Sequence, residues 1–210
     1  APFRMPVFFF ISGYLIRRYI DEVNWRTSLD KRIWSIVWVL ALWGVLQWQA
    51  LTHLNAWLAP ERELATASNA AYADSVSGFV RGMLTASTSL WYLYALVVYF
   101  TLCKLLSRWK LPMLGLLALA SIAINFLPLP WWGMNSVVRN MVYYSLGAWY
   151  GAQLMAWMKG MNLRRSWLIL IASGAVSVVL WFANVPLPLS LLSIVVIMKL
   201  LSLIHISEPT

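Results

Sequence analysis

Long apolar runs separated by short polar connections make up most of this chain. The run Ile33–Leu51 is 19 residues long and carries no charge. As a helix rising about 1.5 Å per residue, it can cross the roughly 30 Å hydrocarbon core of a bilayer. Similar runs recur along the chain, so we predict an all-α, polytopic transmembrane helix bundle with about seven spans. The predicted spans are Met5–Ile16, Ile33–Leu51, Ser89–Cys103, Leu111–Leu127, Met141–Met158, Ser166–Ala183 and Leu187–Leu200.

The composition indicates a membrane protein. Hydrophobic residues make up 61% of the chain and charged residues only 11%, against roughly 25% charged residues in soluble domains. The formal net charge of +9 would fit a nucleic-acid binder if the basic residues shared one solvated face. They form short clusters between apolar runs instead, which is typical of polytopic membrane proteins. We therefore expect the lipid bilayer, and no nucleic acid, as a partner.

The basic residues fall unequally on the two sides of the predicted spans. When the connections are assigned alternately, one side receives twelve of the sixteen Lys and Arg residues. By the positive-inside rule that side is cytoplasmic. Its connections are Arg17–Arg32, Lys104–Lys110 and Lys159–Arg165, together with Lys199, and the outer side has Arg4, Arg62, Arg81 and Arg139.

Both ends of the sequence indicate a piece of a longer reading frame. The chain starts with Ala-Pro-Phe, and the stronger basic cluster follows the first apolar run, whereas a signal peptide has its basic region first. The last ten residues, LSLIHISEPT, match the codon-by-codon translation of a transposase adapter used in sequencing libraries. We expect Leu201–Thr210 to be an artefact and residues 1–200 to be the natural part.

The longest connection is the outer stretch 55–88. Its segment Gly78–Leu84 predicts an interfacial helix that turns four apolar side chains toward lipid, namely Phe79, Val80, Met83 and Leu84. Four tryptophans lie along the second predicted span, and we expect them to pack against neighbouring helices. These are Trp34, Trp38, Trp43 and Trp48.

Few residues could act as a base. Outside the last ten residues the one histidine is His53, at the outer end of the second predicted span. The carboxylates lie in predicted connections, and no predicted span carries a titratable side chain in its interior. Ion-coupled transporters place such groups within the membrane, so that class is disfavoured. His53 is a candidate base, with an interfacial polar role as the alternative.

Three short motifs follow one another along the chain. The first, PFRMPVFFFISGYLI, has a Phe-rich run followed by Ser-Gly-Tyr-Leu, the second is the basic pair Lys31 and Arg32, and the third is SLWYLYALVVYF. In this order they resemble the acyltransferase-3 family of bacterial inner-membrane proteins, in particular its enterobacterial members. The family has about ten helices, so the resemblance implies that residues 1–200 form a partial domain without the first helix and the C-terminal helices.

The resemblance implies transfer of an acyl group, acetyl in the simplest case, from a cytoplasmic thioester to a hydroxyl of a surface or exported glycan. Acetyl-CoA or another acyl-CoA is then a substrate rather than a permanently bound cofactor, and no metal is implied. In the family a basic residue and a His ten residues apart lie on the first helix, which would precede Ala1. We therefore expect this chain alone to be inactive, with His53 as a weaker candidate for the catalytic base.

The connection Arg17–Arg32 is the candidate binding site for the acyl donor. Coenzyme A carries several phosphate charges, and Arg offers bidentate donors to phosphate. Positive-inside selection alone could also account for these charges. Both interpretations stay open for Lys31 and Arg32, whereas topology is favoured for Arg17 and Arg18.

A second set of residues is predicted to lie along the path of the acceptor substrate. For several of them a structural role is the alternative: close helix packing for Ser12 and Gly13, a lipid-phosphate contact for Arg4, and the headgroup layer for Asn135 and Arg139. The set is Arg4, Ser12, Gly13, Tyr14, Trp91, Tyr92, Asn135 and Arg139.

Two other classes of protein remain open beside the acyltransferase. One is a transporter or flippase for a lipid-linked saccharide, and the other is a membrane scaffold without chemistry. A basic residue and a His at the family spacing upstream would favour the enzyme. Acidic residues within further downstream spans would favour transport.

Overall fold

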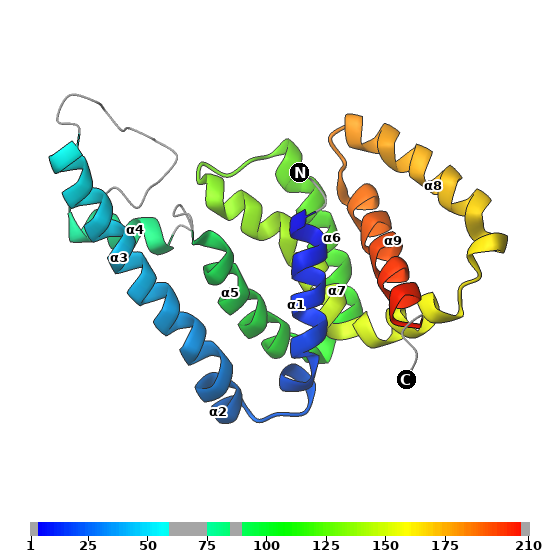
Figure 1. Cartoon of the computed structure of the whole chain (residues 1–210), viewed down its shortest axis with the longest axis horizontal. Coiled ribbons are helices and arrows are strands. Elements are labelled where there is room, and N and C mark those ends of the chain that lie inside the picture. The colour runs from blue at the N-terminus through cyan, green and yellow to red at the C-terminus, as the bar shows by residue number, and fades with distance from the viewer. Residues whose placement is uncertain (1–3, 59–74, 85–89, 207–210) are drawn as a thin grey trace. The chain divides into compact units, whose positions relative to one another are not determined.

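The computed structural model describes residues 4–58, 75–84 and 90–206. Over these residues the chain is helical apart from short connections and has no strand (Figure 1), which confirms the predicted all-α fold. A π-helical turn, η1 (Leu29–Ile33), and a 3-10 turn, η2 (Ser107–Trp109), join some of the helices. The α-helices are α1 (Arg4–Asp21), α2 (Trp25–Ser28), α3 (Trp34–Leu58), α4 (Val76–Leu84), α5 (Trp91–Leu105), α6 (Lys110–Phe126), α7 (Trp132–Gly160), α8 (Leu163–Phe182) and α9 (Leu187–Ile206).

Each predicted span coincides with one helix, in the order α1, α3, α5, α6, α7, α8 and α9. Among the described residues, Trp25–Ala50 and Ser107–Phe126 are long and apolar enough to cross a membrane. Shorter apolar helices cover Trp91–Leu105, Trp167–Phe182 and Leu187–Leu200. The chain is thus an all-α bundle of the membrane type.

Helix α7 begins at Trp132, earlier than the predicted start at Met141. Asn135 and Arg139 therefore lie on this helix, and their predicted place on the outer side of the membrane stays a prediction. A hydropathy reading ends a span at polar residues, although the backbone of a helix continues through them because its hydrogen bonds do not depend on the side chains. The last helix, α9, likewise continues to Ile206, and the predicted artefactual origin of the last ten residues stays a prediction.

The chain divides into two compact units. The first unit comprises Ala1–Glu22, Leu102–Pro128 and Val138–Thr210, and the second comprises Val23–Thr101 and Leu129–Val137. Helices α5 and α7 each contribute residues to both units.

In the first unit α1 crosses α7 at short range because glycines lie at the crossing. A Cβ atom added to Gly13 would overlap the carbonyl oxygen of Tyr144, and one added to Gly147 would overlap that of Phe10. Small residues allow such close approach of helices in membrane proteins. The predicted close packing at Gly13 is confirmed.

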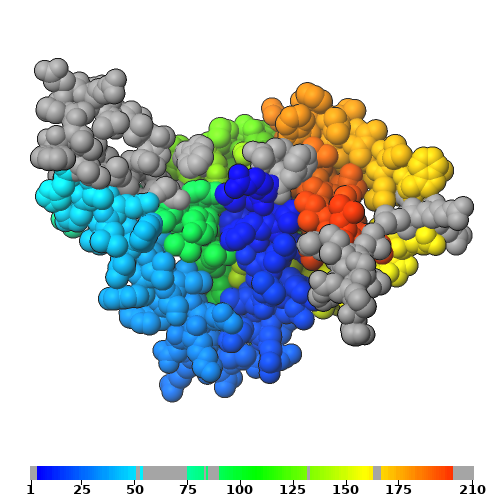
Figure 2. Space-filling view, viewed as in Figure 1, coloured from blue at the N-terminus to red at the C-terminus, as the bar shows by residue number. Residues whose placement is uncertain are grey.

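Helix α9 packs between α1 and α8 (Figure 1). The side chains of α1 and α9 meet along one edge in Figure 2. The turn that brings α9 back along α8 starts at Asn184, which has the left-handed φ of 60°. Its N–H donates to the Trp181 carbonyl at 3.1 Å, and the Val185 N–H donates to the Leu180 carbonyl at 2.9 Å. This pair of hydrogen bonds is a Schellman motif, which ends α8 and redirects the chain.

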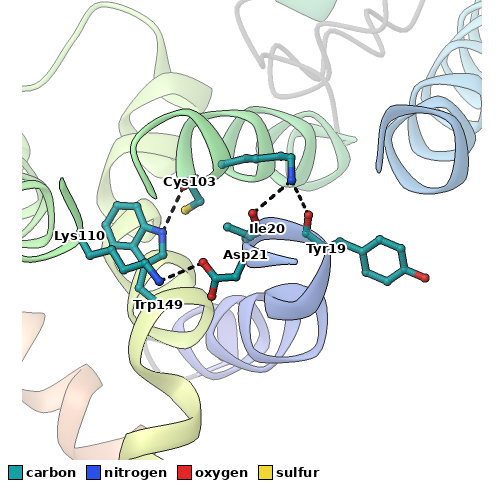
Figure 3. Close-up of polar contacts among 7 residues, drawn as sticks. Tyr19, Ile20, Asp21, Cys103, Lys110 and Trp149 are labelled. Carbon is teal, nitrogen blue, oxygen red and sulfur yellow. Dashed lines mark hydrogen bonds and ion pairs between the residues drawn. The ribbon is translucent and has the colours of Figure 1, made fainter. Parts of the chain in front are cut away.

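Two buried lysines in the first unit bind the last carbonyl groups of a neighbouring helix. Lys104 Nζ donates to the carbonyls of Tyr19 at 2.7 Å and Ile20 at 3.1 Å, at the end of α1 (Figure 3). Lys199 Nζ donates to the Met158 carbonyl at 2.7 Å, near the end of α7. The last carbonyls of a helix have no partner within it, and positive charge is favourable there. Each lysine therefore fastens one helix end to another helix.

In the second unit the short helix α4 packs on α3. The ring of Phe79 stacks on Trp48 with ring centroids 5.1 Å apart and planes inclined by 19°. Phe79 is 8% exposed, so the prediction that this side chain turns toward lipid is wrong. Val80 and Leu84 are exposed, whereas the side chain of Met83 lies outside the described residues.

The tryptophans of α3 differ from the prediction. Trp34, Trp38 and Trp43 are exposed by 65%, 60% and 50%, so the expectation that they pack on neighbouring helices is wrong, while Trp48 does pack, on Phe79. Lipid tails are as apolar as packed side chains. An apolar stripe therefore does not reveal whether it faces lipid or protein.

Candidate functional site

The predicted donor-binding pair lies in the second unit, in the π-helical turn η1 directly before α3. Lys31 and Arg32 are both exposed, and Asp30 precedes them in the same turn. Short π-helical turns are rare and occur frequently at functional sites. Because both side chains are exposed, they can contact a phosphate group from solution. The π-helical turn itself was not predicted from the sequence pattern.

The basic residues at the end of α1 are already engaged by their own helix. Arg17 Nη1 donates to the Tyr14 carbonyl at 2.8 Å, and its guanidinium carbon lies 4.0 Å from the centroid of the Tyr14 ring. The ring lies against Gly151 of α7, where an added Cβ would approach Tyr14 Cδ2 to 2.7 Å. Arg18 forms an exposed ion pair with Glu22 at 3.1 Å. These contacts support a structural role for Arg17 and Arg18, and their predicted contact with the donor stays a prediction.

The candidate residues earlier on α1 differ in their exposure and in their contacts. Arg4 is exposed at the first turn of the helix. Ser12 Oγ donates to the Phe8 carbonyl one turn earlier, at 2.8 Å. Gly13 is buried against α7. Only Arg4 in this group offers an exposed charge to a ligand.

His53, the candidate base, is exposed on α3 in the second unit. Its Nε2 atom lies 3.0 Å from Gln49 Oε1, one turn earlier on the same helix. Among the described residues no three His, Cys, Asp or Glu side chains come together as a metal site would need. An exposed imidazole bound to a glutamine fits an interfacial polar residue, and its role as a base stays a prediction.

The other candidates of the second unit lie on α5 and at the start of α7. Trp91 and Tyr92 are half-buried at the first turn of α5. Asn135 Oδ1 accepts from the Leu129 N–H at 2.8 Å, and its Nδ2 donates to the Leu129 carbonyl at 3.0 Å. The Asn135 amide therefore closes the turn that leads into α7, a structural role that stands beside its predicted contact with substrate.

Arg139 lies in the first unit, among buried polar groups from three helices. Its Nε is buried and has no hydrogen-bond partner among the described residues. The Tyr143 hydroxyl, one turn further along α7, lies near the hydroxyls of Ser121 on α6 and Ser190 on α9 and near the Arg139 charge. The Ser121 hydroxyl donates to the Arg139 carbonyl at 2.9 Å. We call these four residues the Arg139 cluster; the sequence indicated only Arg139, because the hydroxyls come from distant spans.

A second buried polar contact joins α5 and α7 in the first unit (Figure 3). Cys103 Sγ lies 3.2 Å from Ser145 Oγ, and Trp149 Nε1 donates to the Cys103 carbonyl at 3.2 Å. Cys103 and Ser145 are fully buried. These contacts pack α5 against α7 within the first unit.

An apolar groove of about 560 Å³ lies in the first unit between the end of α7 and helices α8 and α9. Its walls include Trp157, Leu170 and Leu192, and none of the predicted site residues lines it. Its lining contains no titratable side chain, so the groove holds no group for acid–base chemistry.

The predicted site residues are thus divided between the two units. Tyr14 and Arg17 are in direct side-chain contact. The first unit holds Arg4, Ser12, Gly13, Tyr14, Arg17, Arg18 and Arg139, and the second holds Lys31, Arg32, His53, Trp91, Tyr92 and Asn135.

The chain belongs to the family described as "Acyltransferase domain", whose sequence model matches residues 1–207. The resemblance drawn from the three motifs is therefore confirmed. The chain is 65% identical over 200 residues to "Inner membrane protein YcfT" of Escherichia coli, an alignment that covers 95% of this chain and 56% of that protein. It is 22% identical over 173 residues to "Nodulation protein NolL" of Mesorhizobium japonicum, which covers 80% of this chain and 41% of that protein. The chain spans about half the length of these curated relatives, and no solved structure matches it.

Proposed function

We propose that this chain is part of an inner-membrane O-acyltransferase that moves an acyl group, acetyl in the simplest case, from a cytoplasmic acyl-CoA to a hydroxyl of a surface or exported glycan. The observation that carries this proposal is the family match over residues 1–207. The inner-membrane location is supported by the name of the 65% identical relative and by the apolar helices of the chain.

The reaction transfers an acyl group from the sulfur of a thioester to the oxygen of a hydroxyl group. The acceptor hydroxyl oxygen attacks the thioester carbonyl, a C–O ester bond forms, the C–S bond breaks, and the thiol of CoA leaves. A base must take the hydroxyl proton and pass it to the departing sulfur, so that CoA leaves as its thiol. We assign that base to the His that the family carries on its first helix, with His53 as the second candidate.

The donor is proposed to bind at the η1 turn. Lys31 and Arg32 are exposed there, and Arg can bind phosphate oxygens in pairs while Lys acts as a point charge. Phosphate groups of CoA would lie against this turn from the cytoplasmic side. Arg26, also exposed on the same connection, provides a control with the same charge outside the turn.

The double variant Lys31→Gln/Arg32→Gln is expected to bind acetyl-CoA about tenfold or more weakly, because two charge-assisted contacts are lost. The affinity is measured as binding of labelled acetyl-CoA to the detergent-purified chain. The control Arg26→Gln is expected to bind acetyl-CoA nearly as tightly as the unsubstituted chain does. An equal loss in Arg26→Gln would mean that total charge, and not this turn, attracts the donor. Unchanged binding in the double variant would remove the turn from the proposal.

Transfer itself can be tested with a chimera in which residues 1–200 replace the aligned part of the 65% identical relative. We expect the chimera to move labelled acetyl groups from acetyl-CoA into a membrane or exported glycan fraction, and the 210-residue chain alone to move none. Transfer by the chain alone would make His53 the first residue to substitute. Movement of a lipid-linked saccharide across the membrane without acetylation would favour a flippase.

A further inference from the structure

Arg139 has a donor that the described structure leaves without an acceptor. Arginine stays charged in proteins and offers five N–H donors. The Arg139 Nε is buried and makes no hydrogen bond to a described residue, although the large majority of buried polar atoms have a partner. The side chain as a whole is only partly buried, so a ligand can approach Arg139 from the exposed side, and a neighbouring side chain must move before the ligand reaches the covered Nε.

The polar groups that the structure places near Arg139 include three hydroxyls. Tyr143 and Ser190 bring two hydroxyls to the cluster, while the Ser121 hydroxyl donates to the Arg139 carbonyl and so holds α6 against α7. The ion pairs Arg18–Glu22 and Lys110–Asp21 do not involve Arg139. A cation beside hydroxyls that can donate hydrogen bonds favours an anionic ligand.

The atom left without a partner indicates which anion fits. The Nε–H and the adjacent Nη–H of arginine form a parallel pair of donors that matches two oxygens of one phosphate group. Arg139 lies on the predicted outer side of the membrane, one or two turns into α7, and the exposed Trp131 precedes this helix. Tryptophan is enriched at the headgroup level of a bilayer, which is where lipid phosphates lie.

We propose that the Arg139 cluster binds the phosphate group of a lipid, with the phosphate oxygens held by the Nε–H and Nη–H of Arg139. Two lipids carry this chemistry at that depth: a phospholipid of the outer leaflet, and the carrier lipid of a saccharide. The second source rests on the proposed function, because it would hold the acceptor by its lipid anchor. The first source does not.

The test measures binding and requires no acyl transfer. Cys103 is the single cysteine and is fully buried in the first unit, so its reaction with a maleimide on heating reports unfolding of that unit. A ligand that binds the folded chain raises the midpoint of this reaction. The probes are phosphatidylglycerol and a polyprenyl phosphate in mixed micelles, each compared with its phosphate-free alcohol, diacylglycerol or polyprenol.

We expect at least one phosphate lipid to raise the midpoint, its alcohol to have no effect, and Arg139→Gln to need about tenfold or more lipid for the same shift. Arg139→Lys keeps the charge but lacks the paired donors, so it is also expected to bind more weakly. Arg108→Gln, which removes an exposed arginine of the first unit, should behave as the unsubstituted chain. If Arg139→Gln does not fold, the comparison of Arg139→Lys with Arg108→Gln carries the test.

Stabilisation by both phosphate lipids would assign the site to phosphate headgroups in general, and stabilisation by the polyprenyl phosphate alone would assign it to the carrier of an acceptor. Equal effects of the phosphate lipids and their alcohols would overturn the proposal. Stabilisation of both Arg139 variants at the same lipid concentration as the unsubstituted chain would also overturn it, as would the absence of any stabilisation by the phosphate lipids. Because transfer is not measured, failure of the acetylation assay would leave this result unchanged.

Discussion

The Gly147→Ala variant is expected to lose roughly 3 kcal/mol of stability, the range of a strongly overpacked site. Its new methyl group would overlap the Phe10 carbonyl oxygen, which belongs to the backbone of α1 and cannot turn aside like a side chain. Helices α1 and α7 would have to separate, and the contact of Gly13 with Tyr144 would be lost with them.

The matched control for this variant is Gly115→Ala in the middle of α6. No atom lies within 4 Å of a Cβ added there, and alanine favours a helix by about 0.5–1 kcal/mol over glycine. The midpoint of Cys103 reaction on heating should fall in Gly147→Ala and stay the same or rise in Gly115→Ala. An equal fall of the midpoint in both variants would show that glycine stabilises these helices for a reason other than the close crossing of α1 and α7.

Lys104→Met is expected to be the second most damaging substitution, at about 3 kcal/mol. Lys104 is 7% exposed and makes two charge-assisted hydrogen bonds to the end of α1, and each such bond contributes about 1.5–3 kcal/mol. The variant would leave the carbonyls of Tyr19 and Ile20 without this donor. Methionine keeps much of the length of the lysine side chain. The loss of stability therefore reports the missing hydrogen bonds of the ammonium group rather than a cavity.

Lys110→Met is the control for Lys104→Met. Lys110 pairs with Asp21 at 2.9 Å, but both side chains are a third or more exposed, and surface pairs contribute about 0–1 kcal/mol. Because Lys104 adjoins Cys103, unfolding is best followed here by loss of helical circular dichroism in a titration with sodium dodecyl sulfate. A midpoint in Lys104→Met equal to that in Lys110→Met would mean that the ammonium does not hold α1.

The helices were predictable from the sequence because apolar runs long enough to span a bilayer leave few alternatives. The direction in which each apolar side chain points was less predictable. Phe79 packs on Trp48, whereas Trp34 is exposed. In the sequence Phe79 and Trp34 are both aromatic residues with apolar neighbours, so the pattern does not distinguish the buried ring from the exposed one. Packing at Gly13 was predictable because small residues have few other uses in such helices, and the spacing of Gly147 and Gly151 offered the same signal on α7.

The candidate site was predictable only residue by residue. Arg139 could be singled out as an arginine on the predicted outer side, but its neighbours Ser121 and Ser190 come from α6 and α9. Their approach depends on how the helices of the first unit pack, which hydropathy does not specify. Likewise Lys104 and Lys199 could be counted as cytoplasmic charges, but their bonds to the ends of α1 and α7 required the fold.

The two lysines that fasten helix ends also affect how membrane orientation can be measured in this chain. Lys104 and Lys199 count toward the positive-inside excess, yet both are buried and bonded to backbone carbonyls. Removing either lysine to invert a topology reporter would weaken the fold and shift the charge balance at once. Arg18, Arg26 and Arg108 are exposed, so an orientation series built on these arginines would separate the sorting signal from the stability of the helix bundle.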